Sequence, residues 1–184
     1  MTRERFIELV TAEQEPLRRF LLALCGGNRA TAEDIAQDAL IKAYLASGEY
    51  VERCKFRTWL FKIAYRTFLD YTKQPHHLIE PLDENTANNM VQSDNMLVTP
   101  TDTAVRYESL YYAIKQLPEQ SRVAILLYHI EGYSIGDIAT ITHCNPIAVR
   151  QRLSRGLKRL KTILKDEKER NAQSNALRIP TRPR

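Results

Sequence analysis

The sequence contains few of the residues that build turn-rich or cross-linked folds. Among its 184 residues are 6 glycines, 8 prolines and 3 cysteines. So few glycines and prolines argue against an all-β chain with many tight turns. The cysteines are odd in number and widely spaced, unlike the disulfide framework of a secreted domain, so we expect a reducing, cytoplasmic environment. They are Cys25, Cys54 and Cys144.

Long apolar runs and common catalytic motifs are absent as well. The longest apolar stretch, residues 20–25, is far shorter than the about 20 residues of a membrane-spanning helix. The N-terminus lacks the apolar segment of a signal peptide. A Gly-rich phosphate loop, HExxH and GxSxG are all missing. We therefore expect a protein that is not an enzyme, needs no cofactor and does not insert into a membrane.

Charge divides the chain into parts. The net charge is +5, yet residues 76–104 contain five acidic residues and no lysine or arginine. This segment has no helical or strand period, which indicates a linker. It separates residues 1–75 from residues 105–168. The polar residues 169–184 are predicted to form a disordered basic tail.

Both flanks have helical periodicity, and no segment alternates with a period of two. The fold class is therefore predicted as all-α, with two small helical domains joined by a flexible linker. Gly26-Gly27 should end the first helix. A second helix is expected to begin at Thr31, with Asp34 as its capping-box partner. A third helix is expected over residues 56–73.

The C-terminal flank has the layout of a helix-turn-helix. Ser134 and Asp137 form a capping box that begins a short helix. Residues 143–145 form a tight turn. Asn145 is a good N-cap, and Pro146 suits the first position of a longer helix. The buried side of this second helix is predicted to contain Val149, Leu153, Leu157, Leu160 and Leu164.

The second helix of this motif is unusually basic. Between Arg150 and Lys165 lie seven cations and no acid. A charge run is usually a solvated face, but ordinary surfaces intersperse both signs, so DNA contact is the favoured interpretation. Arg and Gln pair with base edges in a major groove, whereas cations nearer the C-terminus suit phosphates. The predicted major-groove residues are Ala148, Arg150, Gln151, Arg152, Ser154 and Arg155, and the predicted phosphate contacts are Lys158, Arg159 and Lys161.

Two faces of the N-terminal flank allow two interpretations each. On the second predicted helix, an acidic strip has the spacing i, i+3, i+4, i+7. This strip either docks a basic protein partner or is only a hydrated helix face. On the third predicted helix, basic residues alternate with one aromatic residue. This pattern suits binding of unpaired nucleic acid, or else the aromatic side chain belongs to the core and the basic residues surround it. The acidic strip comprises Asp34, Gln37, Asp38 and Ile41; the basic face comprises Lys55, Trp59, Lys62 and Arg66, with Arg57 just ahead.

Two cysteine features suggest weaker hypotheses. Cys54 lies between Arg53 and Lys55, cations that favour a reactive thiolate. A redox role and a merely exposed thiol both stay open, the second being favoured. His143 and Cys144 are adjacent, and adjacent residues rarely aim at one ion, so no metal site is expected.

Several motifs in register resemble the extracytoplasmic-function (ECF) sigma factors of bacterial RNA polymerase. Residues 32–44, AEDIAQDALIKAY, resemble region 2.2, and residues 56–64, FRTWLFKIA, are similar to regions 2.3 and 2.4. Region 4 is resembled by LPEQSR at 117–122, EGYSIGDIA at 131–139 and VRQRLSR at 149–155.

The resemblance implies a protein that binds core RNA polymerase and directs it to promoter DNA. The acidic strip would then grip the clamp helices of the β′ subunit. Residues 47–55 and the start of the next helix would bind and help open the downstream promoter element. The helix over 146–159 would read the upstream element. An anti-sigma factor is a further partner that the resemblance implies.

The sequence departs from this family at four positions. The family often has Asn, Gly, Thr and Ala where this chain has Arg66, His143, Ala148 and Gly156. Glycine inside a helix costs about 0.5–1 kcal/mol relative to alanine. The departures therefore predict either an altered promoter preference or a softer recognition helix.

Two other functions remain open from the residues alone. A stand-alone helix-turn-helix regulator would bind duplex DNA tightly without polymerase. A helical adaptor would use the acidic strip on a protein, with no salt-dependent DNA affinity. The linker adds a constraint, because its relaxed span of about 30 Å is shorter than most separations of two DNA modules, about 34–70 Å. We therefore expect a compact free form with partly hidden DNA-binding faces.

Overall fold

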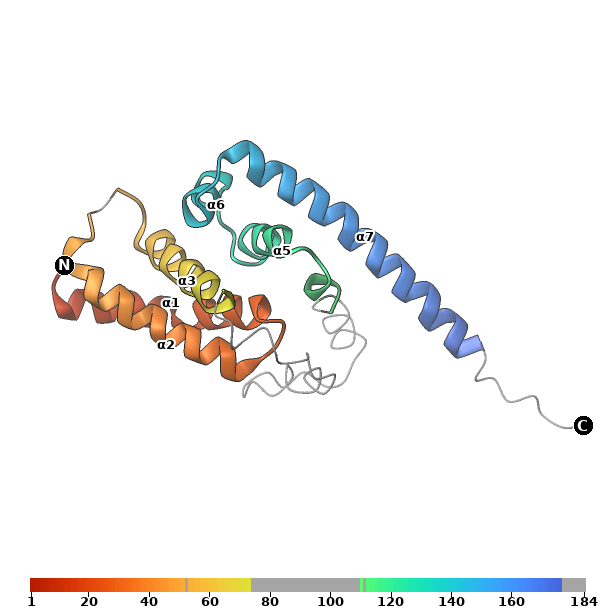
Figure 1. Ribbon diagram of the computed structural model, residues 1–184, viewed down its shortest axis with the longest axis horizontal. Coiled ribbons are helices and arrows are strands. Elements are labelled where there is room, and N and C mark those ends of the chain that lie inside the picture. Colours follow the sequence, from red (N-terminus) through yellow and green to blue (C-terminus); the bar gives the residue numbers. More distant parts are fainter. Residues whose placement is uncertain (52, 74–109, 111, 177–184) are drawn as a thin grey trace, which may run out of the picture.

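The computed structural model describes residues 1–51, 53–73, 110 and 112–176. The predicted linker, residues 76–104, lies outside these residues, as does the end of the predicted tail, 177–184. Every regular element in the described part is helical, which confirms the all-α prediction (Figure 1). The elements are α1 (Arg3–Leu24), α2 (Arg29–Ala46), η1 (Ser47–Glu49), α3 (Phe56–Thr72), α5 (Glu119–Ile125), the π-helical turn η4 (Leu126–Ile130), α6 (Ile135–Thr142) and α7 (Pro146–Ala176).

The helix ends of the N-terminal half follow from local chemistry. Gly26 and Gly27 have φ values of 65° and 92°, a left-handed backbone that glycine adopts at little cost, and they end α1 as predicted. The predicted start of α2 at Thr31 is wrong. The helix begins at Arg29, because the Oδ1 atom of Asn28 accepts a hydrogen bond from the Thr31 backbone N at 3.1 Å. Asparagine is among the strongest N-caps, so it moves the start upstream.

Small side chains let the three N-terminal helices pack closely. The buried face of α2 consists largely of alanines, whose short side chains permit a near approach of α1 and α3. Phe20 of α1 and Phe61 of α3 fill the centre, with ring centroids 5.3 Å apart. The buried alanines are Ala32, Ala36, Ala39 and Ala43.

The predicted helix-turn-helix is present in the C-terminal half. The Ser134 hydroxyl caps α6 by accepting from the Asp137 backbone N at 3.1 Å. The Oδ1 atom of Asn145 accepts from the Ala148 backbone N at 2.7 Å, so it caps the start of α7. Both caps are the residues that the sequence predicts.

One predicted core position of α7 is wrong. Leu157 is 43% exposed, whereas Gly156 is buried. The buried seam instead follows Val149, Leu153, Gly156, Leu160 and Ile163, which recur at alternating steps of four and three residues. Leu157 lies about 100° around the helix from Gly156 and therefore turns away from the seam.

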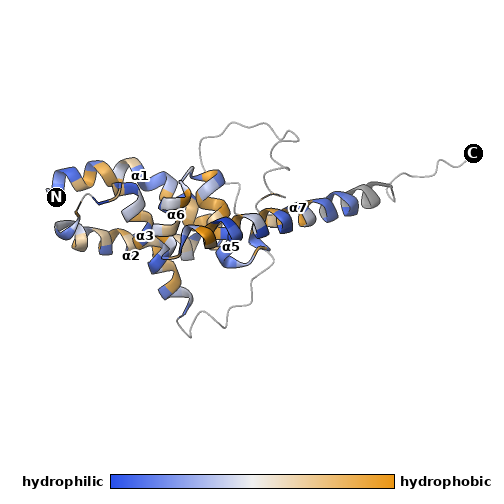
Figure 2. Ribbon diagram, turned by 90° about the horizontal axis from the view of Figure 1, so that it is seen from above, coloured by the Kyte–Doolittle hydropathy of each residue, from blue (hydrophilic) through white to orange (hydrophobic). Residues whose placement is uncertain are grey.

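Helix α7 is longer than expected. It continues to Ala176, so residues 169–176, predicted as part of a disordered tail, are helical. Residues 165–176 contain no glycine or proline, and Lys165 pairs with Glu169 one turn later at 3.7 Å, which supports an exposed helix. Figure 2 shows this end of α7 projecting from the body of the molecule.

The two halves pack against each other, as the linker length predicts. Helix α6 lies against α3, and α5 lies near α1 (Figure 1). Their buried apolar side chains form one continuous cluster. Within the described ranges, none of the helices combines the length and apolarity needed to cross a bilayer.

We predict that Gly156→Ala destabilises the protein although alanine favours helices. A Cβ atom there would lie 2.7 Å from Cδ1 of Ile125 and 3.1 Å from Cβ of Ser121. Overpacking costs about 1–3 kcal/mol, more than the helix-propensity gain of about 1 kcal/mol. The urea midpoint should therefore fall.

The matched control is Gly136→Ala in α6. A Cβ atom there meets only the Ser134 hydroxyl, at an ordinary 3.8 Å. This variant should be as stable as the parent or more so. A Gly156→Ala protein at least as stable as Gly136→Ala would contradict the packing argument.

Candidate nucleic-acid interface

The turn between α6 and α7 depends on a left-handed residue. His143 has φ 50° and ψ 43°, and the Cys144 backbone N donates to the Ala139 carbonyl at 3.1 Å. The family that the sequence resembles often has glycine at this position. A side chain with a Cβ carries a backbone cost in this region. The protein accepts that cost to turn the chain sharply into α7.

The N-terminal part of α7 presents most of the predicted base-reading residues to solvent. Four of the six, Arg150, Gln151, Ser154 and Arg155, are exposed. They lie away from the buried seam of α7, so the helix can enter a DNA groove while its buried side chains stay packed. Arg155 is one turn beyond Gln151, and both point away from the body.

The other two predicted base-reading residues are partly covered. Ala148 and Arg152 are half-buried. The Nη1 atom of Arg152 lies 3.2 Å from the Cys144 sulfur, which is itself 3.0 Å from Oγ1 of Thr142. Burial raises the pKa of the Tyr65 hydroxyl on α3 to about 12, Glu119 acts in the same direction, and the nearby Arg152 charge opposes them. Arg152 thus faces the N-terminal half.

The predicted phosphate contacts form an exposed basic face further along α7. Lys158, Arg159 and Lys161 are all exposed. Of the seven cations between Arg150 and Lys165, only Lys165 forms an ion pair within the described part of the chain. The remaining positive charge is available to a polyanion.

The predicted basic face of α3 is only partly open. Lys55 and Arg66 are exposed, whereas Lys62 is half-buried. Trp59 is half-buried in an aromatic cluster, 5.0 Å from the Tyr50 ring and 5.5 Å from the Phe56 ring. Its ring is thus held in a fixed position with part of its surface open, and base stacking stays a prediction.

The helix-turn-helix turn lies close to this α3 face. Desolvation lowers the pKa of His143, and the positive charges of Lys62 and Arg66 lower it further. The structure therefore brings together two surfaces that the sequence places in separate domains. Arg57, which the sequence groups with the basic face, is instead held in ion pairs with Glu13 and Glu131.

The acidic strip of α2 is exposed along its whole length. Asp34, Gln37 and Asp38 are exposed, and Ile41 is 58% exposed. Leu45, which is not among the predicted residues of this strip, is 76% exposed one turn after Ile41. The i, i+4 spacing of two apolar residues on a polar face is the signal that could have found it.

The redox hypothesis for Cys54 stays a prediction. All three cysteines are free and half-buried. Burial raises the pKa of Cys25 to about 12, against the opposing charge of Arg122, which disfavours the reactive thiolate form of this side chain. In the described ranges, no three His, Cys, Asp or Glu side chains gather as metal ligands would.

Comparison with known families matches both halves. The family described as Sigma-70 region 2 matches residues 9–75, and the one described as Sigma-70, region 4 matches residues 107–160. The RNA polymerase sigma-H factor of Pseudomonas aeruginosa is 35% identical over 137 residues, which cover 67% of this chain and 68% of the relative. The ECF RNA polymerase sigma factor SigW of Bacillus subtilis is 31% identical over 149 residues, which cover 76% and 79%.

Two solved structures share the fold. RpoE of Bartonella quintana, solved with the anti-sigma factor NepR, superposes with a TM-score of 0.70 at 24% identity, covering 88% of this chain and 98% of that one. CnrH, solved with the cytosolic domain of CnrY, superposes with a TM-score of 0.65 at 20% identity, covering 90% of each chain.

We predict that glycine at position 143 lowers the backbone strain of the turn. His143→Gly should be about 1 kcal/mol more stable than His143→Ala, because both variants remove the imidazole but only alanine keeps the left-handed backbone cost. Thermal unfolding of the two proteins measures the difference. Equal melting temperatures would show that the turn carries no backbone strain.

Proposed function

Since this chain belongs to the ECF sigma factors of RNA polymerase, we propose how its surfaces divide that function. The protein binds core RNA polymerase and directs it to promoter DNA. Residues 1–75 are the region 2-like part, which contacts polymerase and the downstream element. Residues 105–168 are the region 4-like part, which contacts the upstream element. Its place of action is the cytoplasm, and it needs no catalytic group of its own.

One observation supports the assignment of α7 to the upstream promoter element. The N-terminal part of this helix is exposed and basic, and it follows a tight turn with a capped helix start. A B-DNA major groove is about 12 Å wide and admits one helix. The N-terminal residues of such a helix reach base edges, while residues further along contact the backbone. Arg150, Gln151, Ser154 and Arg155 accordingly read bases. Lys158, Arg159 and Lys161 set the register by contacting phosphates.

The α3 face is assigned to the downstream element. Opening a promoter requires a surface that holds unpaired bases. Trp59 offers a fixed ring, and Lys55, Lys62 and Arg66 supply positive charge around it. Arg66 stands where the family often has Asn, so its contact is through charge to a phosphate.

The acidic strip is assigned to the clamp helices of the polymerase β′ subunit. Asp34 and Asp38 supply negative charge, and Ile41 and Leu45 supply exposed apolar area at the same face of α2. A patch that combines an apolar anchor with a charged rim is typical of a protein interface. An anti-sigma factor is proposed as a second partner, because RpoE of Bartonella quintana, which shares the fold, was solved with one.

Run-off transcription with purified core polymerase tests the assignment. The wild-type chain should produce transcripts from its promoter, and core polymerase alone should not. We predict that Arg155→Ala weakens recognition of the upstream element by about 1–3 kcal/mol, because a lost bidentate pair costs that much. An unchanged promoter preference would remove Arg155 from the base-reading set.

Lys161→Ala is the control for Arg155. It should weaken binding equally to all promoter variants and reduce the salt dependence. Tight, sequence-specific binding to duplex DNA without polymerase would favour the stand-alone regulator instead.

We predict that Asp38→Ala weakens binding to core polymerase by about tenfold, since it removes a charge from the centre of the acidic strip. Asp70→Ala is the matched control, because Asp70 is an exposed aspartate of the same half outside the strip. Titration of labelled protein with core enzyme measures both affinities. Equal affinities for the two variants would place the polymerase-binding surface elsewhere.

A further inference from the structure

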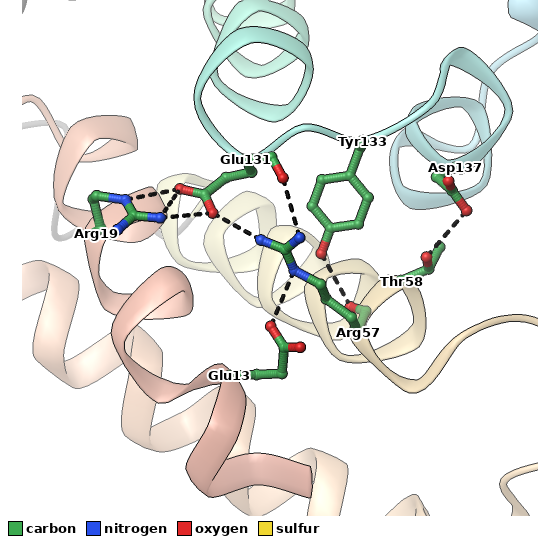
Figure 3. A network of polar contacts seen from close by, with 7 residues as sticks. All are labelled: Glu13, Arg19, Arg57, Thr58, Glu131, Tyr133 and Asp137. Atoms are coloured by element: carbon green, nitrogen blue, oxygen red, sulfur yellow. Dashed lines mark hydrogen bonds and ion pairs between the residues drawn. The ribbon is translucent and has the colours of Figure 1, made fainter.

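A buried carboxylate joins the two halves of the molecule (Figure 3). Glu131 follows the π-helical turn of the C-terminal half, and its side chain is only 1% exposed. Arg19 of α1 donates from Nε and Nη2 to the two carboxylate oxygens, each at 3.0 Å. Arg57 of α3 donates from Nη2 to Oε2, also at 3.0 Å. Both cations come from the N-terminal half, so the negative charge is compensated across the domain boundary.

Arg57 makes further contacts in the same place. Its Nε atom lies 3.0 Å from Oε2 of Glu13, and its Nη1 donates to the Glu131 carbonyl at 3.1 Å. Its guanidinium lies 4.7 Å from the ring centroid of Tyr133 and 5.6 Å from that of Phe61. The Tyr133 hydroxyl donates to the Arg57 carbonyl at 3.3 Å. A planar guanidinium is suited to such combined pairing and stacking.

The contacts of Arg19 and Arg57 with Glu131 exist only while the halves are together, whereas the Arg57–Glu13 pair lies within the N-terminal half. An ionised carboxylate removed from water is tolerated when it is paired and fully hydrogen-bonded, and removing one partner leaves an uncompensated charge. Loss of either arginine therefore acts directly on the closed arrangement. Separation of the halves would leave Glu131 without both of its cations, whereas Arg57 would keep Glu13. The paired carboxylate therefore favours one docking geometry.

The same docking covers surfaces assigned to nucleic acid. Thr58 of α3, itself buried, donates to Oδ1 of Asp137 in α6 at 3.1 Å. The turn residue His143 lies within the electrostatic reach of Lys62 and Arg66. Arg152 faces the α3 side of the interface beside Tyr65. Arg152, which the sequence predicts to read bases, and the edge of the downstream-element face are thus partly covered in the closed form.

We propose that Arg19, Arg57 and Glu131 form an interdomain latch that keeps the free chain closed and covers the edge of its α3 nucleic-acid face, while Lys55 and Arg66 stay exposed. Opening of the latch releases α3 and Arg152 together. The identity of the masked faces rests on the proposed function, whereas the closure rests on the contacts alone.

Small-angle scattering of the full chain tests the closure. Wild-type protein should scatter as one compact body, and Arg19→Gln and Glu131→Gln should increase the radius of gyration. Arg18→Gln is the matched control, because Arg18 is adjacent, 47% exposed against 50% for Arg19, and pairs with Glu33 of its own half at 3.6 Å. It should leave the scattering unchanged. Circular dichroism establishes that each variant keeps its helices.

Binding of a mixed-sequence single-stranded oligonucleotide, without polymerase, tests the masking. The apparent affinity of a chain that is mostly closed is reduced by its open fraction. If the open form is about one tenth of wild type, latch variants should bind about tenfold more tightly, as measured by fluorescence anisotropy. Arg18→Gln should bind like wild type.

Three results would overturn the proposal. A wild-type scattering profile of separated halves would contradict the proposed latch. Latch variants that scatter like wild type would contradict it too. Latch variants with a larger radius of gyration but an unchanged affinity for the oligonucleotide would contradict the proposed covering of the nucleic-acid face. Failure of the proposed function would appear instead as absent transcripts from wild-type protein with core polymerase, a measurement that these tests do not use.

Discussion

The arrangement of this protein depends on the need to compensate one buried negative charge. A carboxylate that loses its water must find cations and hydrogen-bond donors. Among the residues that the structure describes, Glu131 finds them in the other half of the chain, at Arg19 and Arg57. Because guanidinium groups pair with carboxylates in a narrow range of geometries, this requirement fixes how the halves dock. Apolar contacts such as Phe61 with Tyr133, 5.2 Å apart, then complete the interface.

The C-terminal half illustrates how close packing and an exposed binding surface coexist on one helix. Gly156 lets α7 approach α5 closely, so a narrow seam is sufficient to hold the helix. The rest of its circumference then stays free for basic residues. His143 orients that helix by accepting a left-handed backbone in the turn. The proposed DNA-reading role of α7 thus relies on the seam and the turn for its geometry.

The sequence-based predictions succeeded where neighbouring residues determine the outcome. The helix-turn-helix, both of its caps and the exposed basic face of α7 follow from patterns within a few residues. Errors arose where two local signals competed. Asn28 outweighed Thr31 as the N-cap of α2, and charged helix formers carried α7 beyond the predicted boundary at residue 169. Leu157 was predicted to be buried but is exposed, because the buried face of α7 passes through Gly156, which lies close to α5.

The amino-acid sequence alone determined the helical class, the order of the motifs and the chemistry of the surfaces, since periodicity, capping and charge are properties of short segments. Only the tertiary structure decided that Arg57 serves the interface and that Arg152 faces α3. Arg19 and Glu131 are 112 positions apart, and Arg57 and Glu131 are 74 apart. No local pattern links residues at such distances, because their pairing depends on how two finished surfaces dock and exclude water.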